Sequence, residues 1–280
     1  MFIACATDRT YLELAGVMLR SLVVNGEVAT AELVVCSDGL LPEDKDALRA
    51  CTGGRPLTIV DLYRSALPVH GTPGSWPLTT LARLVLPDWL MGSGRPLLFL
   101  DCDTLVLASL RPLFAHDLGG AIVAAAPLTD ADLVREANHR LGRDSAAPYF
   151  SAGVLLVSVD RWRRQGIARQ AFSWAAANPG RIVRPDQDAV NVVMADAISA
   201  LPNRWNWQSQ DTDFSAASIL HFVGRKPNMA SCPHPARQEY LRLRAETPWA
   251  GKPLISEPRR LARSLARRVG GLLRPFLPDT

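Results

Sequence analysis

The feature that most constrains the fold is a short apolar run that ends in two aspartates. Residues 96–100, Pro-Leu-Leu-Phe-Leu, lead directly into Asp101 and Asp103, with Cys102 between them. An unbroken apolar run of this length, bounded by turn residues, is typical of a fully buried strand in a parallel sheet. Side chains two residues apart on a strand project to the same side, so both carboxylates can converge beyond the strand's carboxyl end.

Two adjacent carboxylates repel each other unless a cation or a shared proton lies between them. The pair therefore indicates either a metal site or acid and base chemistry. The structural alternative is a pair of solvated aspartates in a turn. The apolar run before them argues against that alternative, because aspartates at the mouth of a core strand usually serve a ligand.

Composition favours one α/β domain with a small appendage. The chain has 280 residues, of which 48% are hydrophobic, enough for a sizeable core. The formal net charge is +4, but six arginines and one carboxylate, Asp279, lie from Arg259 onward. The rest of the chain is near neutral, so we expect no nucleic-acid partner. No apolar run is long enough to cross a bilayer, and the N-terminus does not resemble a signal peptide.

The cysteines indicate a reducing compartment. Cys5, Cys36, Cys51, Cys102 and Cys232 form no Cys-x-x-Cys pair, and their number is odd. A disulfide framework normally uses an even number of cysteines at regular spacings. We therefore expect a cytoplasmic protein without disulfides.

Apolar periodicity predicts strands and helices that alternate along the chain. The expected strands cover residues 2–6, 32–37, 57–62, 96–100, 121–126, 149–157 and 218–221. The expected helices cover residues 11–24, 42–51, 78–91 and 130–141, then a helix capped by Asp160 that runs to Asn178, and another that begins at Pro185. Alternating units of this length predict a doubly wound, parallel sheet.

Polar residues follow several of the expected strands or open a helix near them. Asp8 lies after the first strand, where a nucleotide's base or ribose can be recognised. Asp186, Gln187 and Asp188 lie in the first turn of a helix, although the helix dipole alone would favour acidic residues there. His221 ends a strand before a glycine turn with a lysine, which suits phosphate, although a lone histidine on a strand is more often structural.

Seven short motifs follow one another over residues 1 to about 230. They are Ala6-Thr7-Asp8 with Tyr11, Ala82-Arg83-Leu84, Leu100-Asp101-Cys102-Asp103, Tyr149-Phe150-Ser151-Ala152-Gly153, Asp186-Gln187-Asp188, Leu201-Pro202 with Trp205-Asn206-Trp207, and His221 to Pro227. In this order they resemble the retaining glycosyltransferases of family 8, which have the GT-A fold and a nucleotide-sugar donor. The resemblance implies an α/β domain over residues 1–250, with a Rossmann-like, mostly parallel central sheet and helices on both faces, followed by a basic tail over residues 251–280.

The resemblance also implies a metal site. Asp101, Asp103 and His221 would hold one divalent ion, for which oxygen ligands with one imidazole suit Mn²⁺ and admit Mg²⁺. The ion would stabilise the charge that develops on the leaving diphosphate. Gly224 and Lys226 would support the same diphosphate, with the lysine acting as a point charge.

The rest of the donor site is implied by the same resemblance. Ala6, Thr7, Asp8, Tyr11 and Cys102 would lie at the nucleotide, with Asp8 reading the base.

Three residues are implied as catalytic groups around the sugar: Arg83, Asp186 and Gln187. Gln187 would stand opposite the leaving group, but an amide is a poor nucleophile, so retention could proceed by front-face return. Ser151 would also contact the sugar, where the family usually has asparagine, and Asn228 replaces a tryptophan that commonly follows Lys-Pro. These two departures affect donor choice and the diphosphate lid rather than the metal.

The implied reaction is transfer of a hexose, galactose or glucose, from a UDP-sugar to a saccharide or lipid-linked glycan, with Mn²⁺. Residues 258–276 place leucines at helical spacing with arginines largely elsewhere on the wheel. Such a basic amphipathic helix can bind an anionic membrane. We therefore expect a peripheral protein at the inner face of the membrane, the alternative being a helix packed on its own domain.

Two other functions are compatible with parts of the sequence. Residues 100–105 also resemble the haloacid-dehalogenase phosphatase motif, in which the first aspartate is the nucleophile and the second an acid or base. That motif normally lies near the start of its domain, whereas three β-units precede it here. The third possibility is an inactive nucleotide-sugar-binding protein that serves as an adaptor at the membrane surface.

Overall fold

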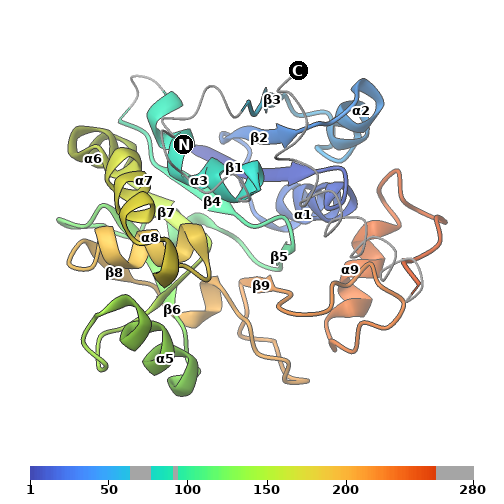
Figure 1. The fold of residues 1–280 in the computed structure, drawn as a ribbon. Coiled ribbons are helices and arrows are strands. Elements are labelled where there is room, and N and C mark those ends of the chain that lie inside the picture. Colours follow the sequence, from blue (N-terminus) through green and yellow to red (C-terminus); the bar gives the residue numbers. More distant parts are fainter. Residues whose placement is uncertain (64–76, 91–93, 257–280) are drawn as a thin grey trace, which may run out of the picture.

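A computed structural model describes residues 1–63, 77–90 and 94–256 (Figure 1). The strands are β1 (Phe2–Asp8), β2 (Glu32–Asp38), β3 (Leu57–Asp61), β4 (Leu97–Leu100), β5 (Thr104–Val106), β6 (Val123–Pro127), β7 (Phe150–Val157), β8 (Ile198–Ala200) and β9 (Ile219–His221). The α-helices are α1 (Leu12–Asn25), α2 (Pro42–Ala50), α3 (Leu78–Trp89), α4 (Arg111–Phe114), α5 (Ala131–Leu141), α6 (Val159–Gln165), α7 (Ile167–Ala177), α8 (Pro185–Val193) and α9 (Arg237–Arg244). The 3₁₀ helices η2 (Pro179–Arg181) and η3 (Asn203–Trp205) lie between them.

The central sheet is mixed, with strand order β3-β2-β1-β4-β7-β6-β8. The pairs β1–β2, β1–β4, β2–β3 and β6–β8 are parallel, whereas β7 runs antiparallel to both β4 and β6. The expectation of a mostly parallel sheet is confirmed, and that of an entirely parallel sheet is wrong at β7. All eight residues of β7 are buried, and a run that is buried throughout carries no information about strand direction.

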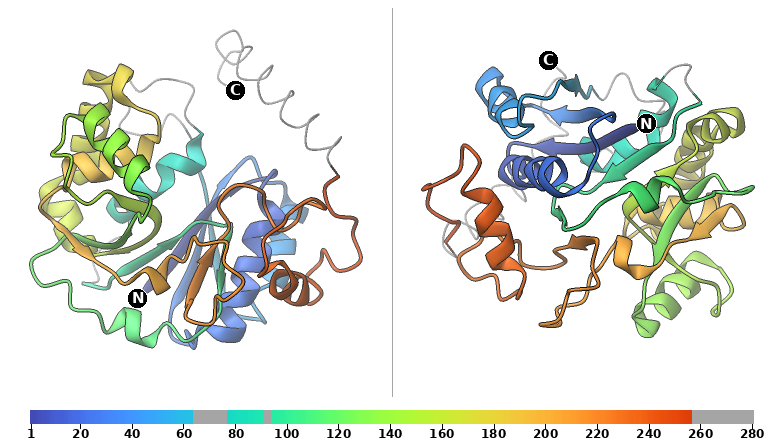
Figure 2. Two further views of the ribbon diagram at one scale, coloured as in Figure 1. Left: turned by 90° about the horizontal axis from the view of Figure 1, so that it is seen from below. Right: turned by 180° about the vertical axis from the view of Figure 1, so that it is seen from behind.

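Alternating side chains of the strands enter two separate cores, one on each face of the sheet. Phe2 and Ala4 of β1 pack in the core beneath α3, α6, α7 and α8, and Ile3 and Cys5 pack in the core beneath α1 and α2. Figure 2 shows the helices on both sides of the sheet. A shift of one residue would exchange these two sets, so the register is tightly determined. The carboxyl ends of β1 and β4 therefore meet at one edge.

A second, two-stranded sheet was not expected from the sequence. In it β5 and β9 are antiparallel, with Thr104 opposite His221. The amide of Phe222 also donates to the carbonyl of Asp103, over 3.0 Å. Residues almost 120 positions apart in the chain are thereby placed side by side, at the edge where β4 ends.

The helix expected from Asp160 to Asn178 is in fact two helices, α6 and α7. Gly166, between them, has φ = +64°, a left-handed conformation that interrupts the helical hydrogen bonding and that glycine adopts without strain. The position before α6 is Ser158, so Asp160 lies inside the first turn and is not the cap. An acidic residue in either place favours the helix dipole, which explains the error of two residues in the position of the cap.

Helix α9 packs beside α1 and extends the described chain beyond the sheet. Arg244 Nε lies 2.7 Å from Glu13 Oε1, and Tyr240 donates to the same oxygen over 3.0 Å. The predicted membrane helix, residues 258–276, lies outside the described residues. Within the residues that are described, no helix is long and apolar enough to cross a membrane. All five cysteines are buried and free, as expected without a disulfide framework.

Helix α8 is held at its first turn by the buried carboxylate of Asp188. Its oxygens accept two hydrogen bonds from Arg140 at 3.0 Å, one from the Tyr149 hydroxyl at 2.6 Å, and backbone bonds from Val183 and Arg184 at 2.8 Å. Burial raises the pKa of Asp188, but these donors outweigh burial and the pKa lies below its ordinary value. The role of Asp188 is therefore more than a favourable interaction with the helix dipole, because its carboxylate is the centre of a buried hydrogen-bond network.

We predict that Asp188→Asn lowers the free energy of unfolding by about 2–4 kcal/mol at pH 7, because Arg140 loses its buried partner. The carboxylate stabilises the fold above its unfolded pKa of about 4, and this contribution is lost as the pH falls toward the lower folded pKa. Urea denaturation from pH 7 to pH 3 should therefore show the difference between the two proteins narrowing below about pH 4.

The matched control is Asp132→Asn, because Asp132 is exposed and pairs with Arg135 along α5. Its cost should stay below about 1 kcal/mol at pH 7. An equal, small cost for both variants would contradict the role assigned to Asp188.

Candidate active site

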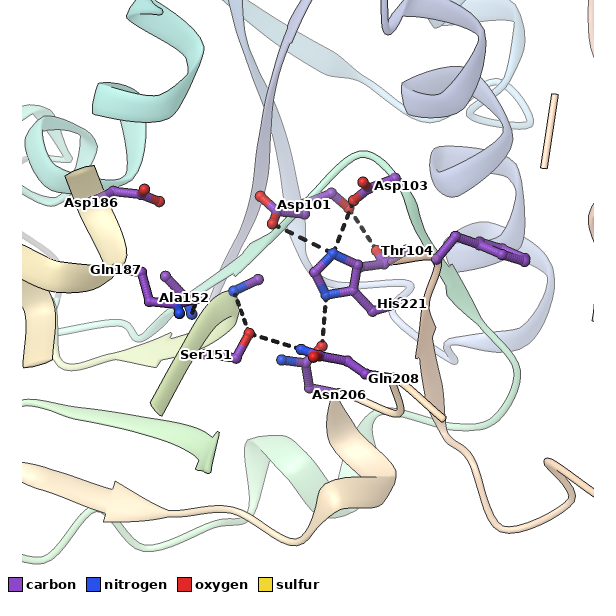
Figure 3. A network of polar contacts seen from close by, with 12 residues as sticks. Asp101, Asp103, Thr104, Ser151, Ala152, Asp186, Gln187, Asn206, Gln208 and His221 are labelled. Carbon is purple, nitrogen blue, oxygen red and sulfur yellow. Dashed lines mark hydrogen bonds and ion pairs between the residues drawn. The ribbon is translucent and has the colours of Figure 1, made fainter. Parts of the chain in front are cut away.

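The acidic pair lies in a tight turn between β4 and β5. The amide of Asp101 donates to the carbonyl of Gly153 on β7 over 2.8 Å. The amide and hydroxyl of Thr104 both donate to the carbonyl of Asp101, over 3.1 and 2.7 Å. These bonds close the turn, and Figure 3 shows both carboxylates beside the ring of His221.

His221 completes a cluster with the two carboxylates. Its Nε2 lies 3.2 Å from Asp103 Oδ1 and 3.7 Å from Asp101 Oδ2. One ligand atom from each of the three residues lies within 4.8 Å of the other two. Two carboxylates and one imidazole form a donor set that suits a divalent ion such as Mn²⁺ or Mg²⁺, so these residues fit the expected metal site.

Positive groups stabilise Asp103 in its charged form. Lys226 Nζ lies 2.6 Å from Asp103 Oδ2 and donates to the carbonyl of Phe222 over 2.7 Å. Burial raises the pKa of Asp103, but His221 and Lys226 outweigh burial and hold it well below the ordinary value. Burial lowers the pKa of His221 and of Lys226, but the neighbouring carboxylates outweigh it and raise both.

Arg83, on α3, joins the acidic pair to α8. Its guanidinium lies 2.5 Å from Asp101 Oδ1 and 2.7 Å from Asp186 Oδ2, and it donates to the carbonyl of Ala152. Burial lowers the pKa of Arg83, but the carboxylates of Asp101 and Asp186 outweigh burial and raise the pKa above its ordinary value. The guanidinium therefore stays charged. Burial raises the pKa of Asp186, although Arg83 opposes this effect.

Gln187 and Ser151 face the same part of the site from α8 and β7. Gln187 Oε1 accepts a hydrogen bond from the amide of Ala152 over 3.1 Å. The hydroxyl oxygen of Ser151 accepts bonds from Gln208 Nε2 over 3.0 Å and from the amide of Gly153 over 3.3 Å. The structure thus places Gln187, on α8, against the backbone of β7, the strand that carries Ser151.

The remaining predicted residues surround this centre. Ala6 and Thr7 are buried in β1. Asp8, at its end, accepts backbone bonds from Thr10 and Tyr11 over 2.8 and 2.9 Å, so one of its oxygens holds the turn before α1. Cys102 is buried, which raises the pKa of its thiol well above the ordinary value.

The predicted glycine turn after β9 is present. Gly224 has φ = +79°, so its backbone adopts the left-handed conformation that favours glycine.

Four residues of the site were missed by the sequence reasoning. Asn206 Oδ1 lies 2.9 Å from His221 Nδ1, and Asn191 exchanges two side-chain bonds with the backbone of Phe150. The others are Thr104 and Gln208, described above. Asn206 belongs to the motif Trp205-Asn206-Trp207, but its contact with His221 depends on the backbone pairing of this motif with β9, which the sequence does not show.

The described fold is similar to that of solved glycosyltransferases. The structure of galactosyltransferase LgtC in complex with donor and acceptor sugar analogues superposes with a TM-score of 0.75, at 24% identity, over 90% of this chain and all of that one. The apo structure of the bifunctional glycosyltransferase WbbM gives a TM-score of 0.74 at 19% identity, over 89% of this chain and half of that one. At these identities the similarity establishes the GT-A fold.

The family is decided by the sequence profile of glycosyl transferase family 8, which matches residues 2–228. The chain belongs to this family. Among curated relatives, General stress protein A of Bacillus subtilis is 26% identical over 91% of this chain and 97% of its own length. The lipopolysaccharide glucosyltransferase WaaO of Escherichia coli is 24% identical over 90% of this chain and 80% of its own. The family 8 enzyme described here is therefore a hexosyltransferase, and the phosphatase hypothesis is wrong.

We predict that Gly153→Ala displaces His221 and weakens metal binding by at least about tenfold. A Cβ atom at this position would lie 2.4 Å from His221 Cε1 and 2.6 Å from Nδ1, far inside van der Waals contact. Calorimetric titration with Mn²⁺ measures the effect.

Gly180→Ala is the control, because a Cβ atom there meets nothing within 4 Å. The same Mn²⁺ affinity in both variants and the wild type would contradict the close packing of His221 on Gly153.

Proposed function

We propose that this family 8 enzyme transfers galactose or glucose from a UDP-sugar to a saccharide or lipid-linked glycan, with retention and with Mn²⁺ or Mg²⁺. The observation that carries the proposal is the convergence of Asp101, Asp103 and His221 at the carboxyl end of β4. Three ligand atoms at one point, in a glycosyltransferase, indicate a site for the cation that accompanies a nucleotide diphosphate. The bound ion would supply positive charge where the leaving diphosphate becomes more negative.

The chain's own groups would bind the leaving diphosphate beside that site. Lys226 carries a charge close to Asp103 and is anchored by the carbonyl of Phe222, so its ammonium group has little freedom. The turn at Gly224 leaves the backbone open, since a Cβ atom there would meet nothing within 4 Å. We assign the nucleotide to the end of β1, with Ala6, Thr7, Asp8, Tyr11 and Cys102 around it.

Arg83, Asp186 and Gln187 would act at the sugar. The buried ion pair of Arg83 with Asp186 fixes the first turn of α8, and the amide of Ala152 holds the Gln187 carbonyl. A side chain held in this way is suited to stabilising positive charge on the sugar ring, whereas an amide oxygen is a poor nucleophile. We therefore propose that the acceptor attacks from the face that the diphosphate leaves, which retains the configuration. Ser151 would contact a sugar hydroxyl.

The acceptor and the location follow from less direct arguments. WaaO, a relative over most of both chains, is a lipopolysaccharide glucosyltransferase, which supports a lipid-linked glycan as acceptor. We propose that residues 1–250 form the catalytic domain and that the basic tail over residues 251–280 binds the anionic inner face of the membrane. The enzyme would then be cytoplasmic and peripheral.

The direct test is a panel of UDP- and GDP-sugars with saccharide acceptors, assayed for nucleotide release with and without Mn²⁺. We predict turnover with a UDP-hexose that requires the cation and falls about 100-fold or more in Asp103→Asn, because that variant loses a ligand oxygen and its charge. Circular dichroism should show the variant folded.

Asp196→Asn, at an exposed position, serves as the control and should keep full activity. Tight UDP-sugar binding without turnover in the wild type would support the inactive adaptor instead. Full activity of Asp103→Asn, or activity unaffected by a chelator, would contradict the proposed metal site.

The membrane hypothesis has its own test. Deletion from Pro258 onward removes all six arginines of the tail, so we predict loss of binding to anionic vesicles at low salt with sugar transfer in solution unchanged. Vesicle sedimentation measures the binding. A truncated protein that still sediments with the vesicles would overturn the hypothesis.

A further inference from the structure

The aromatic loop between β8 and β9 has no role in the function described so far. It contains Trp205 and Trp207, and Asn206 between them is only 4% exposed. Asn206 Oδ1 lies 2.9 Å from Nδ1 of His221, the ring nitrogen that faces away from the two carboxylates (Figure 3). The loop therefore carries a polar group to the back of the candidate metal ligand.

The backbone holds this contact in register. The amide of Trp207 donates to the carbonyl of Ile219 over 2.9 Å, and the amide of His221 donates to the carbonyl of Trp207 over 2.8 Å. The amide of Asn206 closes the 3₁₀ turn by donating to the carbonyl of Asn203 over 2.9 Å. Because its neighbour Trp207 is bonded to β9 and its own amide closes the turn, Asn206 has a fixed position relative to the His221 ring.

The amide oxygen determines which nitrogen of the ring can bind a cation. A neutral imidazole has one N–H donor and one acceptor nitrogen, and a carbonyl oxygen can only accept. When Asn206 Oδ1 accepts the hydrogen on Nδ1, the lone pair of His221 lies on Nε2, on the side of Asp101 and Asp103. The opposite tautomer would direct an N–H group at the cation.

The strand β7 also restrains the ring, along the edge formed by Cε1 and Nδ1. A Cβ atom on Gly153 would lie within 2.6 Å of two ring atoms of His221, so β7 packs directly against the imidazole. With β7 against the ring and an acceptor behind it, rotation away from the carboxylates would break the Asn206 contact. The arrangement selects both the orientation and the tautomer.

Asn206 makes this contact at a cost to the fold. Its Nδ2 is buried and has no hydrogen-bond partner among the described residues. An unpaired buried amide N–H group costs free energy, so an apolar residue of the same size would suit the loop equally well if only stability mattered. The carbonyl half of the side chain is the part that has a partner.

We propose that Asn206 is a positioning residue that holds His221 in the tautomer and orientation needed to ligate the divalent cation, an inference that rests on the proposed metal site. Partners of this kind, bound to the far nitrogen of a ligating histidine, typically change metal affinity by about 10–100-fold when removed. The chemistry requires only an acceptor at this position, so a carboxylate should replace the amide.

The test compares Asn206→Leu with Asn206→Asp, with Asn203→Leu as a control in the same loop because Asn203 is exposed. Binding of Mn²⁺, alone and with UDP, is followed by the electron paramagnetic resonance signal of the free ion. We expect Asn206→Leu to bind Mn²⁺ about 10–100-fold more weakly than the wild type. The Mn²⁺ affinities of Asn206→Asp and Asn203→Leu should lie within about threefold of the wild-type affinity. At saturating Mn²⁺ the kcat of Asn206→Leu should recover, since the defect lies in affinity.

Wild-type affinity in Asn206→Leu would overturn the inference, as would a folded Asn206→Asp that binds as weakly as Asn206→Leu. Thermal midpoints of all variants show which of them are folded. If Asn206→Leu does not fold, the Mn²⁺ affinity of Asn206→Asp relative to the wild type tests the inference. Failure of the metal site itself has a different signature: Asp103→Asn would then bind Mn²⁺ as well as the wild type does.

Discussion

The site depends on how the chain compensates the mutual repulsion of Asp101 and Asp103. Arg83 lies against one carboxylate, Lys226 against the other, and His221 near both. Two cationic side chains and a histidine ring thus offset the negative charge of the acidic pair. The space between the two carboxylates is lined by carboxylate oxygens and an imidazole nitrogen. A divalent cation bound there would be stabilised by all three groups. The acidic pair and its partners therefore form one electrostatic unit.

The fold supplies these partners from distant parts of the sequence. Arg83 comes from a helix before β4, and His221 and Lys226 come from β9 and its turn. The short pairing of β5 with β9 is what places the ring beside the aspartates. Because β5 starts at Thr104, directly after the acidic turn, the same backbone segment both positions Asp103 and pairs with the strand that carries the histidine.

Much of the fold and of the candidate site was predictable from the sequence. The parts that were not predictable depend on tertiary contacts. Local apolar patterns located the strands and helices and placed Asp101 at a strand end, because burial and alternation act over a few residues. The direction of β7, the break at Gly166 and the contact of Asn206 with His221 depend on tertiary pairing or on a single backbone dihedral. Family resemblance indicated the candidate ligand residues, but it said nothing about the group behind the ring.

The proposed activity depends on a cation that binds together with the donor's diphosphate. The most direct measurement is calorimetric titration of the enzyme with UDP, with and without saturating Mn²⁺, and with Mn²⁺ in the presence and absence of UDP. Binding free energies are reciprocal, so the account predicts that each ligand tightens the other by the same factor, and that the factor disappears in His221→Ala. UDP affinity that does not change with Mn²⁺ would contradict it.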